Sequence, residues 1–91
     1  MKPIQIEIFT SPGCTRCTRV LGVLQGIVAD LGEDQIQWRK VNVLDELDHA
    51  VQLGVLSMPA IAIDGELVFT VHPSPEKFRA TLQERLNRRA S

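Results

Sequence analysis

The chain has 91 residues, enough for one small domain with a single hydrophobic core and too few for two. Its 10 basic and 11 acidic residues leave a net charge of −1, so no overall positive field favours nucleic acid or an anionic membrane as a partner. It contains no run of about 18 apolar residues and no apolar region typical of a signal peptide. We therefore expect a single domain over residues 1–91, soluble and cytoplasmic.

The first two elements are predicted to be a strand and a helix. Apolar and polar residues alternate from Ile4 to Ile8 and run into Phe9-Thr10, which predicts a strand that Ser11-Pro12-Gly13 breaks. From Cys14 onward, apolar residues recur every three or four positions, which predicts one helix ending at Gly32. Its buried stripe is expected to consist of Cys17, Val20, Leu21, Leu24, Ile27, Val28 and Leu31.

A second strand is predicted over residues 36–43. The apolar positions change face between Trp38 and Val41, which indicates either a bulge or a late start of the strand. We interpret Trp38 as a packing residue of this strand rather than as part of a functional site.

A short helix is predicted next. Asp45 is expected to cap it, Asp48 lies in its first turn, and Gly54 ends it. The periodicity places three apolar residues on one face, which we expect to be the buried one: Leu47, Ala50 and Val51.

The rest of the chain is predicted to form a hairpin and a helix. Asp64-Gly65 is a strong turn signal between the two apolar segments 60–63 and 66–69, because both turn residues tolerate positive φ. Ser74 is expected to cap the last helix, whose apolar residues repeat every four positions. These residues are Phe78, Leu82 and Leu86.

Cys14 and Cys17 are the only cysteines, and they lie where the first strand turns into the first helix. Residues i and i+3 of a helix are about 5–6 Å apart, within the Cα separation of roughly 4.4–6.8 Å that a disulfide tolerates. A bond across about four residues would contribute only about 2 kcal/mol, which favours reactivity over stabilisation as its role. A reducing cytosol also disfavours a lasting structural disulfide.

The order β-α-β-α-β-β-α, with Cys14-Thr15-Arg16-Cys17 after the first strand, resembles the thioredoxin fold. The segment 54–60, which contains Met58-Pro59, resembles the part of the family that carries a cis-proline, and Lys40-Val41-Asn42 resembles a piece of the family's second strand. The resemblance implies an α/β protein with a four-stranded mixed sheet flanked by three helices. It also implies a small thioredoxin/glutaredoxin-like redoxin that acts as a thiol–disulfide oxidoreductase.

The two cysteines are expected to have different roles. Cys14 lies at the exposed start of the helix, where unpaired backbone N–H groups, the helix macrodipole and Arg16 favour its thiolate. Cys17 lies deeper and is expected to be the resolving thiol. We therefore expect Cys14 to attack a protein disulfide and Cys17 to release the reduced product.

The resemblance also implies a substrate-binding site. The family's cis bond would place the backbone of Met58 beside the active sulfur, although only about 5–6% of all X-Pro bonds are cis. A trans proline opening an edge strand is the alternative. The residues expected to contact substrate are Gly13, Thr15, Arg16, Ser57, Met58 and Pro59.

The chain departs from the family pattern around the first cysteine. Thioredoxins usually have Trp where this chain has Gly13, and Gly-Pro where it has Thr15-Arg16. The acidic residue that thioredoxins bury beneath the resolving cysteine aligns with Ile8. A carboxylate to assist Cys17 would therefore have to come from Glu7.

Glutathione is the less favoured electron donor. Glutaredoxins hold it with a Gly-Gly-Asp-like stretch, where this chain has Val71-His72-Pro73-Ser74, and Ser57 stands in place of their threonine before the proline. The resemblance therefore implies an upstream reductase, or another thiol donor, as the partner that reduces the protein.

An adaptor of a second functional class, redox-switched or metal-binding and without turnover, remains the alternative. His49 and His72 could join the cysteines as zinc ligands, but they lack the close His pairing of zinc modules. Two chains could instead share an iron–sulfur cluster through Cys14. We expect a monomer that holds no metal or other cofactor.

Overall fold

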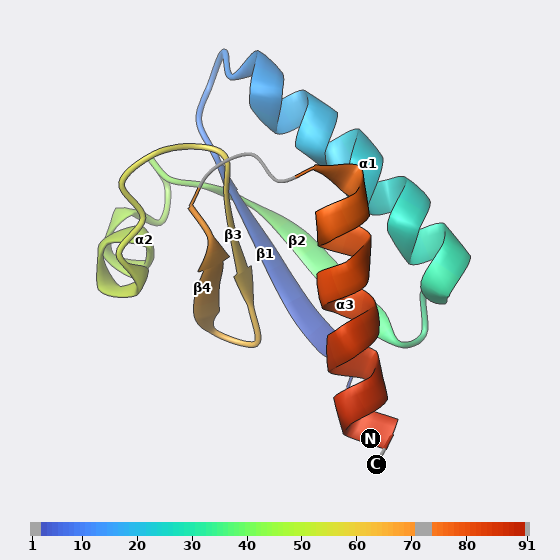
Figure 1. Cartoon of the computed structure of the whole chain (residues 1–91). Helices are drawn as coiled ribbons and strands as arrows, with labels where there is room; N and C mark the ends of the chain where they lie inside the picture. Colours follow the sequence, from blue (N-terminus) through green and yellow to red (C-terminus); the bar gives the residue numbers. More distant parts are fainter. Residues whose placement is uncertain (1–2, 71–73, 91) are drawn as a thin grey trace.

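The computed structural model describes residues 3–70 and 74–90 (Figure 1). Its elements follow the predicted order: β1 (Ile4–Thr10), α1 (Thr15–Leu31), β2 (Ile36–Asn42), α2 (Leu47–Leu53), β3 (Ala60–Ile63), β4 (Glu66–Phe69) and α3 (Pro75–Ala90). The four strands form one sheet in the order β2-β1-β3-β4, with β2 parallel to β1 and the other neighbours antiparallel. The expected α/β architecture, a mixed sheet with three helices, is confirmed.

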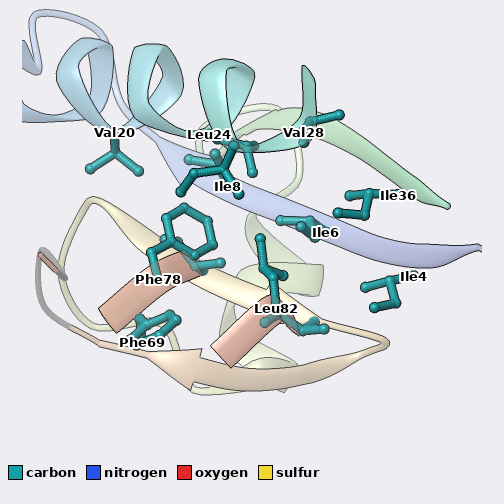
Figure 2. Close-up of a cluster of buried hydrophobic side chains, with 13 residues drawn as sticks. Ile4, Ile6, Ile8, Val20, Leu24, Val28, Ile36, Phe69, Phe78 and Leu82 are labelled. Atoms are coloured by element: carbon teal, nitrogen blue, oxygen red, sulfur yellow. The ribbon is translucent and has the colours of Figure 1, made fainter. Parts of the chain in front are cut away.

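Two apolar clusters cover opposite faces of the sheet. The larger joins the sheet to α1 and α3, and Figure 2 shows Phe78 and Leu82 of α3 pointing toward the side chains of β1 and α1. The smaller cluster joins the other face to α2 and includes Phe9, Val41 and Ala50. Burial of these side chains is the main stabilising contribution to the fold. In the described residues, no helix is long and apolar enough to cross a membrane.

The change of face in β2 comes from this two-sided covering and not from a bulge. β2 pairs with β1 in unbroken register from Ile36 opposite Ile4 to Asn42 opposite Thr10. Ile36 and Trp38 pack into the larger cluster, whereas Val41 packs into the smaller one. The interpretation of Trp38 as a packing residue agrees with this arrangement. Each end of the strand is thus buried on a different face.

The hairpin and the last helix form as predicted. Asp64 and Gly65 have φ values of 52° and 82°, the left-handed conformation that a two-residue turn between twisted strands requires. The hydroxyl of Ser74 accepts a hydrogen bond from the backbone N–H of Lys77 and so caps α3. Phe78 and Leu82 are buried.

The prediction for α2 was wrong at its start and on its buried face. The backbone carbonyl of Asn42 accepts hydrogen bonds from the N–H groups of Asp45 and Glu46, which closes a turn before the helix. Asp45 belongs to this turn, and the N-cap of α2 is Glu46. The side chains of Leu47 and Val51 are 59% and 67% exposed, and Ala50 is the buried residue of the helix. A helix of two turns contacts the sheet along a narrow line, which leaves its flanking apolar residues in solvent. The predicted helix end holds, since Gly54 is left-handed.

Candidate active site

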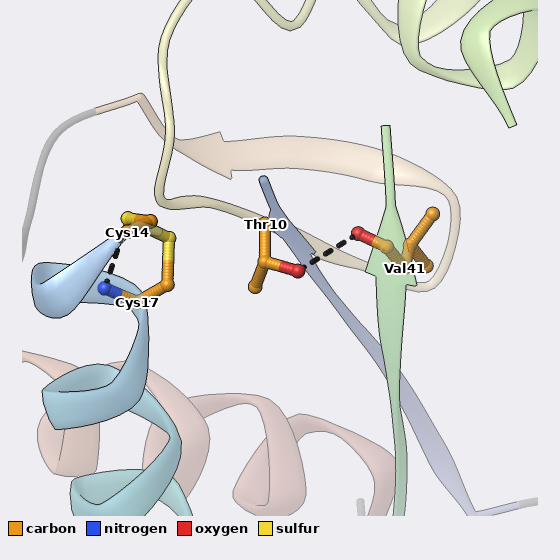
Figure 3. The surroundings of a disulfide bond; sticks show 4 residues. All are labelled: Thr10, Cys14, Cys17 and Val41. Atoms are coloured by element: carbon orange, nitrogen blue, oxygen red, sulfur yellow. Dashed lines mark hydrogen bonds between the residues drawn. A yellow bond between two sulfur atoms is a disulfide. The ribbon is translucent and has the colours of Figure 1, made fainter. Parts of the chain in front are cut away.

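Cys14 and Cys17 form a disulfide at the junction of β1 and α1 (Figure 3). Their Cα atoms are 5.3 Å apart, within the range predicted from the spacing. Ser11-Pro12-Gly13 ends the strand, and Gly13 has a φ of 78°, which an L side chain rarely adopts. The turn is closed by a hydrogen bond from the N–H of Cys14 to the carbonyl of Ser11. The local sequence therefore places both sulfurs at the helix start.

The two sulfurs lie in unequal environments. Cys14 is the N-cap of α1, is partly exposed, and its Sγ accepts a hydrogen bond from the backbone N–H of Cys17 over 3.1 Å. Cys17 is only 3% exposed and belongs to the buried stripe of the helix. The first turn of α1 carries no acidic residue that would oppose a negative charge at Cys14. Cys17 is thus more buried than Cys14, as expected from the sequence.

The segment before β3 lies at the same end of the sheet as the disulfide, next to the C-terminal end of β1. The Met58–Pro59 peptide bond is cis, as the resemblance implied. Ala60 is the register partner of Phe9, so the proline precedes β3 at the edge where β1 runs toward Cys14. The hydroxyl of Ser57 donates a hydrogen bond to the carbonyl of Thr70.

A pocket of about 350 Å³ opens beside the disulfide, on the β2 side. Both cysteines line it, together with hydroxyl residues of the turn and of α1 and with Lys40 of β2. Thr10 lies in its wall, and its buried hydroxyl donates to the carbonyl of Val41 (Figure 3). Among residues 3–70 and 74–90, no carboxylate lines this pocket, and Ile8 of β1 is fully buried.

The idea that Glu7 supplies a carboxylate to Cys17 is wrong. Strand alternation turns Glu7 to the α2 face, where its Oε2 accepts hydrogen bonds from Arg39 and lies 2.9 Å from Nε2 of His49. Burial of this carboxyl opposes its ionisation, but the hydrogen bonds from His49 and Arg39 outweigh burial and lower its pKa. Glu7 is therefore a structural carboxylate.

The disfavoured alternative of a zinc site gains no support from the described residues. His49 lies on α2 against Glu7 and the ring of Phe9. In the described part of the chain, no three His, Cys, Asp or Glu side chains are grouped so that they could hold a metal. His72 and its neighbours Val71 and Pro73, on which the glutathione argument also rests, lie outside the described residues.

Comparison with known proteins decides the family. The family model described as a thioredoxin domain matches residues 4–83. The chain belongs to the thioredoxin-domain family. It is 30% identical over 83 residues to a probable thioredoxin of Methanothermobacter thermautotrophicus, across 91% of this chain and 96% of that one. It is 28% identical to a thioredoxin of Methanocaldococcus jannaschii, across 94% of this chain and all of the relative.

A solved structure agrees on the fold. Thioredoxin 1 from Thermosipho africanus TCF52B superposes with a TM-score of 0.77 at 20% identity, across 96% of this chain and 99% of that one. With a cysteine pair at disulfide distance in a thioredoxin-family chain, the protein is a thiol–disulfide oxidoreductase.

Sequence reasoning named Gly13, Cys14, Thr15 and Cys17 of the pocket wall, but it missed Thr10 and Lys40. The only sequence signal of Lys40 is its part in the Lys40-Val41-Asn42 resemblance, and that of Thr10 is its place at the end of a predicted strand. One available signal was the charge distribution, because residues 8–29 contain no acidic residue around the cysteine pair. The position of Lys40 relative to that pair depends on the β1–β2 register.

Proposed function

We propose that the protein reduces disulfides in protein substrates, with Cys14 as the nucleophile and Cys17 as the resolving thiol. The observation that carries this assignment is the difference in exposure between the two sulfurs. Cys14 is the partly exposed residue of the pair and is the one that a large partner can reach, and the N–H that donates to its Sγ favours its thiolate. Cys17 lies one turn along the helix, within bonding distance of Cys14.

Reduction proceeds by two exchanges. The Cys14 thiolate attacks one sulfur of the substrate disulfide, a mixed disulfide forms, and the other substrate sulfur leaves as a thiolate that takes up a proton. The Cys17 thiolate then attacks Cys14 Sγ, the mixed disulfide breaks, and the second substrate thiol is released. Two electrons pass to the substrate, and the Cys14–Cys17 disulfide remains. An upstream reductase or thiol donor restores the dithiol.

The substrate segment is proposed to lie between two parts of the chain. Gly13, Thr15 and Arg16 flank the nucleophile, and all three are exposed. Ser57, Met58 and Pro59 form the opposing segment, in which Met58 is partly buried against the smaller cluster. An extended substrate backbone placed between them would bring its disulfide to Cys14.

The family suggests a disulfide-containing protein as substrate and a reductase as partner. We extend this to a single-domain monomer acting in the cytoplasm, reduced by another protein rather than by glutathione.

The test traps the mixed disulfide. A Cys17→Ser variant keeps the nucleophile and lacks the resolving thiol, so it should accumulate a covalent complex with a disulfide-bonded model protein. A Cys14→Ser variant is the matched control and should accumulate none. Non-reducing electrophoresis and mass spectrometry measure both. A complex that forms through Cys17 in the Cys14→Ser variant, and not through Cys14, would overturn the assignment.

A further inference from the structure

The segment that carries the disulfide has only basic residues among its charged ones, although the whole chain has a net charge of −1. Residues 8–29 contain two arginines, Arg16 and Arg19, and no acidic residue. Within residues 3–70 and 74–90, neither arginine forms an ion pair, and Lys40 forms none either. By contrast, Arg39 and Arg79 are paired with carboxylates away from the disulfide.

The place of Lys40 in the sheet explains why it forms no ion pair with the described carboxylates. It is the register partner of Ile8, so the two residues lie on the same face of the sheet. Ile8 is buried and apolar, and β2 is the edge strand of the described sheet, β2-β1-β3-β4. Facing it across the pocket is the start of α1, which carries only neutral and basic side chains over its first four turns. The ammonium group of Lys40 is thus uncompensated.

The pocket beside the disulfide brings this charge to the reacting sulfurs. We call it the Lys40 pocket; Cys14, Cys17, Ser11, Thr15, Thr18 and Lys40 are among the residues that line it. Of the described residues in its wall, Lys40 is the one that is charged. Its volume of about 350 Å³ exceeds that of a single amino-acid side chain. A group bound there lies beside both redox sulfurs and meets a cation and hydroxyl donors.

We propose that the Lys40 pocket is a specificity subsite for a carboxylate that neighbours the target disulfide. This inference rests on the proposed function and names the class of disulfide that the site prefers. An ammonium group and hydroxyls complement a carboxylate, and no acidic side chain among the described residues lines the wall to repel it. The carboxylate comes from an acidic residue next to the cysteine of a protein substrate, or from a small anionic disulfide.

The experiment compares matched disulfides. Two peptides with one intramolecular disulfide differ only in Asp or Asn next to a cysteine, and dithiodipropionate is compared with bis(2-hydroxyethyl) disulfide. Reduced protein is freed of excess reductant, and its oxidation rate is followed by quenching with an alkylating reagent. The quantity measured is the anionic-to-neutral rate ratio for wild type, Lys40→Gln and Lys40→Glu. Lys77→Gln is the matched control, because Lys77 is exposed on α3 and does not line the pocket.

We expect wild type and Lys77→Gln to favour the Asp peptide by about two- to fivefold, the size of an exposed ion pair. Lys40→Gln should bring the ratio close to one, Lys40→Glu should invert it, and about 1 M salt should suppress it. A preference confined to the peptides assigns the subsite to protein substrates, and a preference also for dithiodipropionate extends it to small disulfides. A wild-type ratio of one, with both peptides reduced, overturns this inference and leaves the proposed function standing. If the protein reduces neither peptide, both this inference and the proposed function are overturned.

Discussion

The backbone N–H of Cys17 donates a hydrogen bond to Sγ of Cys14 over 3.1 Å, so the resolving residue also supplies a donor to the nucleophile. An amide donor and the N-terminal end of a helix both stabilise negative charge on sulfur. In the reduced protein, the pKa of the Cys14 thiol should therefore lie below the ordinary cysteine value of about 8.5.

Alkylation across pH measures this effect. We expect Cys14 of the reduced protein to react with iodoacetamide with a midpoint below that of an ordinary cysteine, and Cys17 to react much more slowly because it is buried. Peptide mapping by mass spectrometry separates the two sites, and reduced protein unfolded in urea is the control for unperturbed thiols. Equal rates at the two sites, with a midpoint near about 8.5, would contradict the assignment of the nucleophile.

Glu7 should link stability to acid pH. Its folded-state pKa is lowered below the ordinary 4.5, so its contribution is present above that value and is lost as pH falls through the folded pKa. Glu7→Gln should lower the free energy of unfolding by about 1 kcal/mol at pH 7, and the difference from wild type should shrink on going to pH 3. Urea unfolding at both pH values measures this.

Glu84→Gln is the control for Glu7, because Glu84 pairs with Arg88 on the exposed surface of α3. We expect a change of about 0.5 kcal/mol or less there. An undiminished Glu7→Gln effect at pH 3 would mean that packing, and not the charge, is what the substitution removes.

Leu82 should be essential to the larger cluster. It is fully buried under the sheet, so Leu82→Ala should lower the free energy of unfolding by about 2–5 kcal/mol. Leu56→Ala is the matched control, since Leu56 is 97% exposed and its loss should change stability by about 0.5 kcal/mol or less. Both are measured by denaturant unfolding of the oxidised protein. Similar losses in the two variants would argue against the packing of α3 on the sheet.

Two glycines should respond to alanine with opposite signs. Gly54 ends α2 with a φ of 85°, so Gly54→Ala should destabilise the protein by about 1 kcal/mol. Gly22 lies inside α1 with open space around the position of a Cβ, so Gly22→Ala should stabilise it by about 0.5–1 kcal/mol. Thermal unfolding of both variants and of wild type measures whether each substitution raises or lowers stability. Destabilisation by Gly22→Ala would show that the helix contacts something at that position.

Much of the site could be predicted because its signals are local. The spacing of Cys14 and Cys17 fixes their separation on one helical turn, and the strand-breaking residues before them fix where that turn begins. The same holds for the hairpin at Asp64-Gly65, whose backbone preference belongs to the two residues themselves.

The tertiary structure decided which faces are covered and which distant residues meet. Periodicity shows that a strand has two faces, but it does not show that β2 is buried on one face at Ile36 and on the other at Val41. The pairing of Ile8 with Lys40 is a matter of register between strands about thirty residues apart. This register brings Lys40 into the wall beside Cys17, whereas alternation along β1 itself turns Glu7 to the other face. The sequence by itself determined the reactive pair, and strand register determined the charge beside that pair, because a side chain's own position carries no information about its neighbour across the sheet.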